Sequence, residues 1–184
     1  MLTVTVPETE YFDERTQKFS VSKSRSLTLE HSLVSLSKWE AKWKKPFMSR
    51  KDKTPEELLD YIRCMTVTQN VDEETYQNLA CHSEVIEQIT EYIKDPMTAT
   101  TFSSAQESRS GMSGKVVTAE IIYYWMIQHN IPIEFQKWHL NRLLTLIKVC
   151  NIKSSPGKKM PKNAVLSRNR ALNAQRRAMM NSRG

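Results

Sequence analysis

Residues 118–150 read TAEIIYYWMIQHNIPIEFQKWHLNRLLTLIKVC and hold the densest apolar pattern of the chain. The first apolar run, Ile121 to Ile127, predicts a helix that is buried on most sides and has Thr118 as its N-cap candidate. Asn130 and Pro132 interrupt the pattern before a second helical run of apolar residues: Phe135, Trp138, Leu140, Leu143, Leu144, Ile147 and Cys150. So short a connection favours an antiparallel helix pair, which we expect at the centre of the core.

The first thirty residues show a two-residue period instead of a helical one. Apolar and polar side chains alternate in three short runs, which predicts half-buried antiparallel strands. The apolar members of these runs are Leu2, Val4, Val6, Phe19, Val21, Leu27 and Leu29.

The segment that follows, residues 29–47, fits two structures. Its first half continues the alternation of a strand, whereas Leu33, Leu36, Trp39 and Trp43 also fall on one face of a helix. Further along, Thr54, Pro55 and Glu57 make a capping box with proline at the first helical position. Asp72 and Ser83 are N-cap candidates for two more helices, and Asp95-Pro96 ends the second of them.

These patterns predict an α+β fold that is mainly α. Short N-terminal antiparallel strands (1–30) are followed by a helical body (31–152) with the central antiparallel helix hairpin. Residues 97–116 are rich in serine, threonine and glycine, which is typical of a loop. A basic C-terminal tail (153–184) contains helix-forming residues from Ala164 to Met180 but few large apolar groups, so we expect it to be flexible unless a partner binds it.

The positive charge of the chain is concentrated in this tail. From Lys153 onward there are nine basic residues and no acidic one, out of totals of 27 basic and 20 acidic residues. Residues 1–152 therefore carry 18 basic and 20 acidic residues, a balance of −2, while the whole chain has a net charge of +7. A basic tail of this kind attracts phosphate backbones or acidic protein surfaces. A solubilising tail without a partner is the simpler interpretation.

Two other segments carry an unbalanced charge. Residues 54–95 contain ten acidic and two basic residues, which fits a solvated helical face or an acidic docking surface. Residues 38–53 are basic and include two tryptophans one helical turn apart, which fits a partner-binding stripe or simple core packing. The candidate partner-binding residues are Trp39, Trp43, Lys44, Lys45, Lys158, Lys159, Arg168, Arg170, Arg176 and Arg177.

The sequence shows no signature of catalysis. Its four histidines and three cysteines lack the spacings of a metal site: His31, His82, His129, His139, Cys64, Cys81 and Cys150. The turn at 110–115 has only two residues between its glycines, too few for a phosphate-binding loop. We therefore expect no catalytic residue, metal or cofactor. The cysteine pattern favours reduced thiols in a cytoplasm, and we expect neither an export signal nor a membrane span.

Four stretches resemble a group of small proteins of tailed phages that are encoded beside the tail genes and are similar in role to tail assembly chaperones. The resemblance covers most of residues 27–152. It rests on Leu29 to Phe47, Asp60 to Asn70, Ala119 to Met126 and Gln136 to Ile147.

The resemblance implies a protein that binds other proteins and has neither catalytic activity nor a cofactor. Such chaperones coat the long helical tape-measure protein in the host cytoplasm and help to recruit tail-tube subunits around it. Self-association along such a client would suit the separated charges. Two alternatives stay open: a structural component of the virion, such as a tail or head–tail joining protein, and an accessory protein that binds nucleic acid non-specifically through its basic tail.

Overall fold

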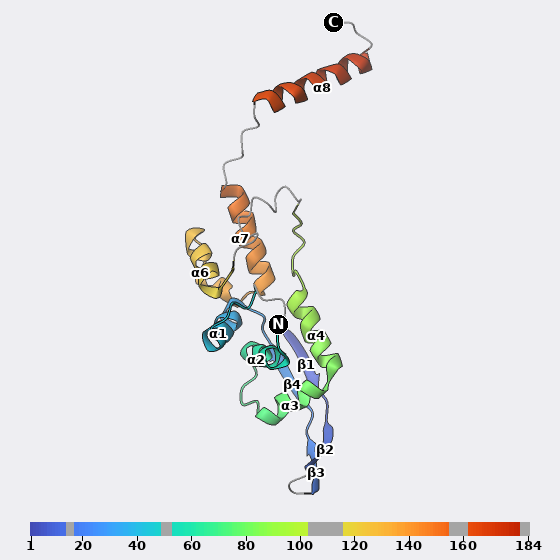
Figure 1. Ribbon diagram of the computed structural model, residues 1–184, viewed down its shortest axis with the longest axis vertical. Helices are drawn as coiled ribbons and strands as arrows, with labels where there is room; N and C mark the ends of the chain where they lie inside the picture. The colour runs from blue at the N-terminus through green and yellow to red at the C-terminus, as the bar shows by residue number, and fades with distance from the viewer. Residues whose placement is uncertain (14–16, 49–52, 103–115, 155–161, 181–184) are drawn as a thin grey trace. The chain divides into compact units, whose positions relative to one another are not determined.

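The computed structural model describes residues 1–13, 17–48, 53–102, 116–154 and 162–180 (Figure 1). The chain forms two compact units, which we call the body (Met1–Ile152) and the C-terminal unit (Lys153–Gly184). It is an α+β protein, mainly helical, with two short antiparallel strand pairs at the N-terminus, so this part of the expected fold class is confirmed. The flexibility expected for the C-terminal tail stays a prediction.

The two strand pairs form one interrupted hairpin. Both pairs have the same register, with Leu2 opposite Leu29 and Thr9 opposite Ser22. The ladder breaks around Pro7, whose ring nitrogen has no hydrogen to donate to a neighbouring strand. The inner pair is β1 (Leu2–Val6) with β4 (Arg25–Leu29), and the outer pair is β2 (Thr9–Asp13) with β3 (Lys18–Ser22).

The inner pair buries the apolar face that the alternation predicts, but the outer pair does not. Val6 and Leu27 are fully buried, whereas Phe19 is 75% and Val21 46% exposed, and Ser22 is buried instead. Ser22 and Leu27 lie an odd number of residues apart, so an uninterrupted strand would point them to opposite faces. The break shifts the pleat by one residue, and the expectation that Phe19 and Val21 would be half-buried was wrong.

Helices and their connections follow the strands in the described part of the body, and several helices begin where the sequence predicted. The Thr54–Glu57 capping box is present, and Asp72 accepts the main-chain N–H of Thr75 at 2.9 Å. Ser83 is not a cap, because His82 holds the N-cap position and makes no side-chain capping bond. The described helices of the body are α1 (Leu33–Trp43), α2 (Pro55–Met65), α3 (Glu73–Cys81), α4 (Ser83–Lys94), α6 (Ala119–Gln128), the 3-10 helix η1 (Ile133–Lys137) and α7 (Leu140–Ser154).

Residues 33–43, which fitted either a strand or a helix, form α1. Ser32 caps it by accepting the main-chain N–H of Ser35, whose own hydroxyl reaches back to the N–H of Ser32. Leu33, Leu36 and Trp39 are fully buried along one side of this helix. They pack with the inner strand pair and α2 in a single core.

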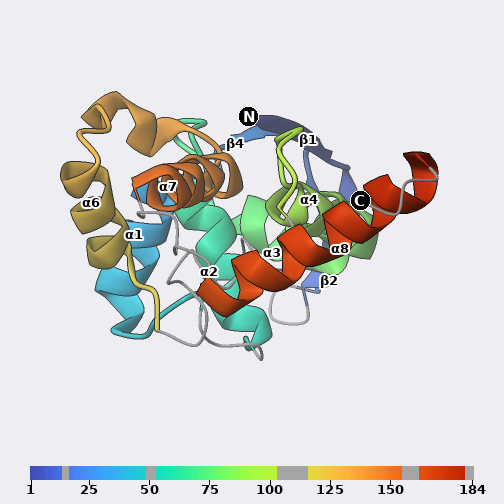
Figure 2. The same cartoon turned by 90° about the horizontal axis from the view of Figure 1, so that it is seen from above.

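The apolar stretch 118–150 forms α6, η1 and α7 in turn. Asn130 takes a left-handed conformation (φ 51°), which asparagine tolerates, just beyond the end of α6. The second helix was expected to include Phe135. Instead Phe135 lies in η1, and α7 begins only at Leu140. α6 packs mainly against α1 (Figure 2). The direct antiparallel pairing of α6 with α7 stays a prediction.

A chain of buried rings crosses the body, and we call it the aromatic chain. Phe47 stacks on Tyr61 with ring centroids 4.0 Å apart, and the edge of Phe47 meets Trp39 at 5.0 Å. The Tyr61 hydroxyl is hydrogen-bonded to Nδ1 of His31 at 2.7 Å, and the ring of His31 meets that of His139 at 4.9 Å. The aromatic chain thus joins α1, α2 and the start of α7.

The surroundings of the two histidines of the aromatic chain lower the pKa of both rings. Burial, and to a lesser extent the neighbouring His139, lower the pKa of His31 to about 3. Burial also lowers the pKa of His139, against the opposing effect of its hydrogen bond to the main-chain oxygen of Tyr92. A proton on the buried ring of His31 is therefore unfavourable inside the folded body.

Acid is expected to destabilise the body through His31. Below pH 6.5 an unfolded histidine takes up a proton, whereas folded His31 takes one up only near pH 3, so stability falls as pH decreases through this window. The substitution His31→Gln should flatten the dependence of the free energy of unfolding on pH by up to about 1.4 kcal/mol per pH unit. Urea titrations at pH 7, 5.5 and 4 measure this slope.

Tyr61→Phe is the matched control, because it removes the hydroxyl partner of His31 but keeps the titrating ring in its buried place. This variant should lose stability at every pH and keep most of the slope. Equal slopes for the wild-type chain and His31→Gln would contradict the assignment.

Candidate protein-binding surfaces

Trp39, the first of the candidate binding residues, lies wholly inside the body. Its indole N–H donates to the main-chain oxygen of Glu57 at 2.9 Å, and its ring stacks on that of Trp43 with centroids 5.9 Å apart. Its side chain has no exposed surface, so it contacts only this chain. Of the two interpretations of this tryptophan, partner binding and core packing, its position is that of core packing.

Trp43 is half-buried at the end of α1, where it joins a cluster around Asp60. The indole N–H of Trp43 donates to Oδ2 of Asp60 at 2.8 Å, and Lys42 pairs with the other oxygen of the same carboxylate. Arg63 lies 3.8 Å from that carboxylate. Asp60 is buried, so the cluster ties α1 to α2 and leaves Trp43 only partly accessible to a partner.

The two lysines of the candidate set differ in their surroundings. Lys45 pairs with the fully buried Glu57 at 2.8 Å, and its ammonium lies 5.3 Å from the ring centroid of Trp43. Lys44 ends α1 in a left-handed conformation (φ 54°), and its side chain is exposed. Trp39, Trp43 and Lys45 thus help to fasten the end of α1 to α2, whereas the side chain of Lys44 is exposed.

Glu40 has a structural role in this region that no sequence pattern indicated. Its carboxylate is buried and accepts two main-chain N–H groups, from Phe47 at 2.8 Å and from Ala119 at 2.7 Å. Burial raises the pKa of Glu40, and the two hydrogen bonds oppose this rise. Ala119 opens α6, and Thr118 makes no side-chain capping bond, so Glu40 caps α6 from 79 residues away along the chain.

Removing the Glu40 carboxylate should destabilise the body. In Glu40→Ala two buried N–H groups lose their acceptor, and each orphaned donor costs about 1–3 kcal/mol. We expect a loss of about 2–5 kcal/mol in the free energy of unfolding, measured by urea denaturation. Glu87→Ala, at an exposed position of α4, is the control and should stay within about 0.5 kcal/mol of wild type. Equal stabilities for the two variants would refute this role.

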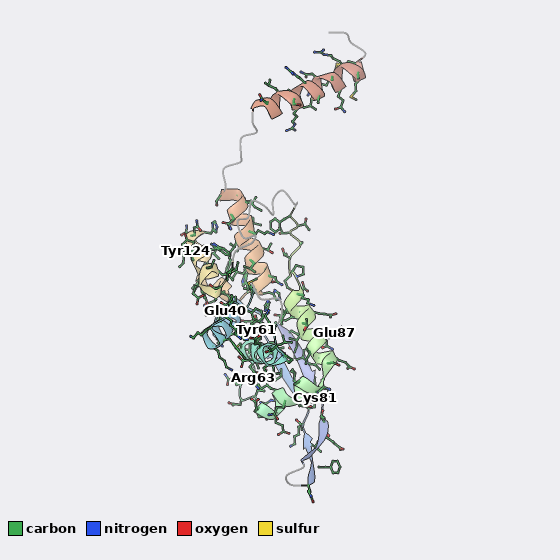
Figure 3. All side chains as sticks on the ribbon, in the orientation of Figure 1. Glu40, Tyr61, Arg63, Cys81, Glu87 and Tyr124 are labelled. Carbon is green, nitrogen blue, oxygen red and sulfur yellow. The ribbon has the colours of Figure 1, made fainter. Side chains whose placement is uncertain are left out.

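The outer side of α6 exposes apolar side chains, against the expectation of burial on most sides. Tyr124 is 60% and Ile127 75% exposed, one helical turn apart on the same side (Tyr124 is labelled in Figure 3). Glu120 and Gln128 complete this side, which we call the α6 face. The opposite side of α6, with Ile122 and Met126, is buried. The core thus covers one side of α6 and leaves the α6 face exposed.

The acidic segment 54–95 divides into buried and exposed groups. Glu57 and Asp60 are buried, whereas the other eight carboxylates are exposed. Asp72 pairs with Arg25 and Glu73 with Arg63, so part of this charge is balanced locally. The interpretation as a solvated helical face therefore fits most of the segment. It does not fit Glu57 and Asp60, which are buried and bind residues at the end of α1.

Three glutamates follow one exposed side of α4, and we call them the α4 acidic stripe: Glu84, Glu87 and Glu91. Their spacing of three and four residues places them in a row along the helix. None of them makes an ion pair with another residue in the described part of the chain. Figure 3 shows Glu87 on the outer side of α4.

An apolar groove of about 210 Å³ lies beside this helix, where α2, α3 and α4 meet. Leu58, Leu59 and Ile62 of α2 form one wall, and Ile86 of α4 forms another. Glu56 lies at its margin, and Glu87 follows Ile86 directly on α4. The groove therefore has an apolar lining with one carboxylate, that of Glu56, among the residues around it.

The C-terminal unit carries the remaining candidate residues. Arg168, Arg170, Arg176 and Arg177 are all exposed on α8 (Lys162–Met180), which has no acidic residue. Exposed apolar side chains accompany them, with Leu172 39% and Met179 82% exposed. Lys158 and Lys159 lie outside the described residues.

Side chains that could bind a metal ion are scattered over the described residues. Within these residues, no three His, Cys, Asp or Glu side chains approach one another closely enough to hold a metal ion. Cys64, Cys81 and Cys150 are free thiols, and burial raises the pKa of Cys64. No described helix combines the length and the apolar character needed to span a bilayer.

Comparison with known proteins gives no relative. No protein-family model, no curated protein sequence and no solved structure matches the chain.

Proposed function

We propose that this protein is a non-catalytic assembly factor of the tail assembly chaperone type. It would bind tail proteins of a phage, such as the tape-measure protein or tail-tube subunits, in the host cytoplasm before the tail is complete. The resemblance, which covers most of residues 27–152, supports this proposal, and the α6 face is the structural observation that carries it.

A chaperone for a long helical client needs an apolar surface that is exposed and already formed. An extended helix with an apolar stripe aggregates unless another surface covers the stripe. Tyr124 and Ile127 offer such a surface, because they are exposed although the core beneath α6 is complete. A tyrosine suits this role, since its ring is a large apolar group with a polar tip.

The α6 face is held in place by the core. Glu40 fixes the start of α6, and the Tyr123 hydroxyl donates to Oε1 of Gln136 in η1 at 2.9 Å. The buried side of the helix packs mainly against α1. Binding therefore does not require α6 to be ordered first, which lowers the entropic cost of binding a client.

The double substitution Tyr124→Ser/Ile127→Ser is expected to abolish co-purification with the tape-measure protein when the two are co-expressed. Both side chains are exposed, so the fold should keep its helical circular dichroism and its free energy of unfolding within about 0.5 kcal/mol. Affinity purification followed by quantification of the client band measures the effect.

Val67→Ser is the matched control, because Val67 is 50% exposed on a different part of the body. It should leave the amount of bound client unchanged. Full retention of the client by the double variant would exclude the α6 face, and the absence of any tail protein from the wild-type purification would count against the chaperone itself.

Binding of nucleic acid by the C-terminal unit is the second candidate, favoured by the arrangement of arginines on α8. Arg168 and Arg176 lie on one side of the helix, and Arg170 and Arg177 lie on nearly the opposite side. Such a helix carries positive charge on two sides, and arginines that neutralise phosphates bind them without reading the base sequence.

Substituting the four arginines by glutamine tests this candidate in the full chain. If α8 binds DNA, the slope of log K against log salt should become shallower by about 0.9 for each phosphate that the variant no longer neutralises. Lys94→Gln/Lys137→Gln, on the body, is the control. Unchanged retention on DNA at two salt concentrations would remove this candidate.

Mass spectrometry of purified particles tests the structural alternative. A chaperone should be absent from mature virions, whereas a tail or head–tail joining protein should be present in them.

A further inference from the structure

The strand β1 has a partner strand on one side only. It pairs with β4, and within the described residues no strand lies along its other edge. A free edge presents unpaired main-chain N–H and C=O groups, and proteins usually protect such an edge with charged residues or proline. The sequence of β1, from Leu2 to Val6, contains no charged residue and no proline. This edge is therefore well suited to pairing with a further strand.

The register of the inner pair shows which main-chain groups point to the free edge. Thr28 of β4 directs its own groups away from β1, because its carbonyl accepts the N–H of Val67 and its N–H donates to the Thr68 hydroxyl, both at 2.8 Å. Thr28 lies opposite Thr3. Opposite residues of an antiparallel pair that do not bond each other both direct these groups outward, and the pattern recurs at every second residue. The N–H and C=O groups of Thr3 and Thr5 therefore point to the free edge.

The α4 acidic stripe lies on the same side of the body as this edge. α4 packs against β1 (Figure 1), and its Ile86 side lines the apolar groove together with α2. α2 in turn leads into the segment that bonds the far side of β4. At about 100° per residue, Glu84 and Glu91 lie about 160° and 140° round α4 from Ile86. These two carboxylates are therefore turned away from α2 and β4, toward the free edge of β1.

The charge of the stripe decides which kind of strand fits this edge. Side chains of an added strand would alternate between the open face of the sheet and the face covered by α4. Those on the α4 side would lie beside Glu84 and Glu91, which are exposed and make no ion pair within the described residues. A second copy of β1 would bring a second acidic stripe close to the first, and like charges repel. Cations at alternate positions of the added strand would be attracted instead.

We propose that the free edge of β1 and the α4 acidic stripe bind an extended segment of another protein that carries lysine or arginine at alternate positions. The segment adds to the inner pair as a further strand. Its main chain bonds Thr3 and Thr5, and its cations face Glu84 and Glu91. This surface shares no element with the α6 face, so the inference goes beyond the proposed function and does not depend on it.

A short labelled peptide in which lysine alternates with valine is the probe, and its fluorescence anisotropy with the full chain measures binding. The same peptide with glutamate in place of lysine should bind at least about tenfold more weakly, because its charges repel the stripe.

N-methylation of the lysine peptide tests strand pairing separately from charge. The amides of an extended strand point alternately to its two edges, so only one of the two alternate sets faces β1. Methylating that set should weaken binding by about tenfold or more, since it removes donors and blocks the approach of the strand. Methylating the other set should leave the affinity nearly unchanged.

Substitutions in the chain test the two halves of the site. Thr3→Pro removes an N–H at the free edge and should weaken binding by about tenfold, whereas Thr3→Ala keeps this N–H and should bind like wild type. Glu84→Gln/Glu91→Gln should weaken binding by about fivefold and reduce its dependence on salt. Glu56→Gln/Glu134→Gln makes the same change of charge at exposed positions elsewhere and should have little effect. Circular dichroism checks that each variant is folded.

Three outcomes would overturn the proposal: no binding of the lysine peptide, equal affinities of the lysine and glutamate peptides, or equal effects of the two methylated sets. The last comparison uses the wild-type chain, so it decides the matter even if Thr3→Pro does not fold.

Two measurements on the free chain identify a different occupant of the edge. A dimer in sedimentation velocity that Thr3→Pro dissociates would assign the edge to a second copy. Slow hydrogen exchange of the Thr3 and Thr5 amides in a monomer would assign it to another segment of the same chain. Either result would contradict the proposal. None of these results bears on client binding by the α6 face, which the Tyr124→Ser/Ile127→Ser experiment measures independently.

Discussion

The buried carboxylate of Glu40 is the interaction on which the rest of the body depends. It accepts the N–H of Phe47, which places the turn after α1, and the N–H of Ala119, which places the start of α6. A buried charge is costly unless hydrogen bonds satisfy it, and the free N–H groups at a helix start supply such bonds. The end of α1, the turn that follows it and the start of α6, which is distant in the sequence, are thereby held at one point of the core.

The position of α6 links this constraint to function. Because Glu40 caps α6 and Ile122 and Met126 anchor its inner side, Tyr124 and Ile127 are presented outward on a fixed support. Glu57 and Asp60 act in the same manner on α1 and α2, where they engage Lys45, Lys42 and Trp43. The buried carboxylates of the body thus fasten its helices to one another, whereas the exposed glutamates of the α4 acidic stripe make no ion pair within the described residues.

Local signals allowed much of the fold to be predicted from the sequence. The Thr54–Glu57 box and the Asp72 cap depend on residues three positions apart, and both are present. The exposure of Val21 was not predictable, because it follows from a shift of the pleat at the break near Pro7. The role of Glu40 was hidden because its partner Ala119 lies 79 residues away. The burial of Trp39 could not be predicted for a related reason, since it depends on packing against α2.

Amide hydrogen exchange at Ala119, followed by NMR, tests the central constraint most directly. The first N–H groups of a helix have no acceptor within the helix and ordinarily exchange quickly. If the Glu40 carboxylate holds the Ala119 N–H as described, this amide should exchange as slowly as the core amides of Ile122 and Met126. Exchange of Ala119 at the rate of an open loop would mean that α6 is not fixed by Glu40, and would contradict the account.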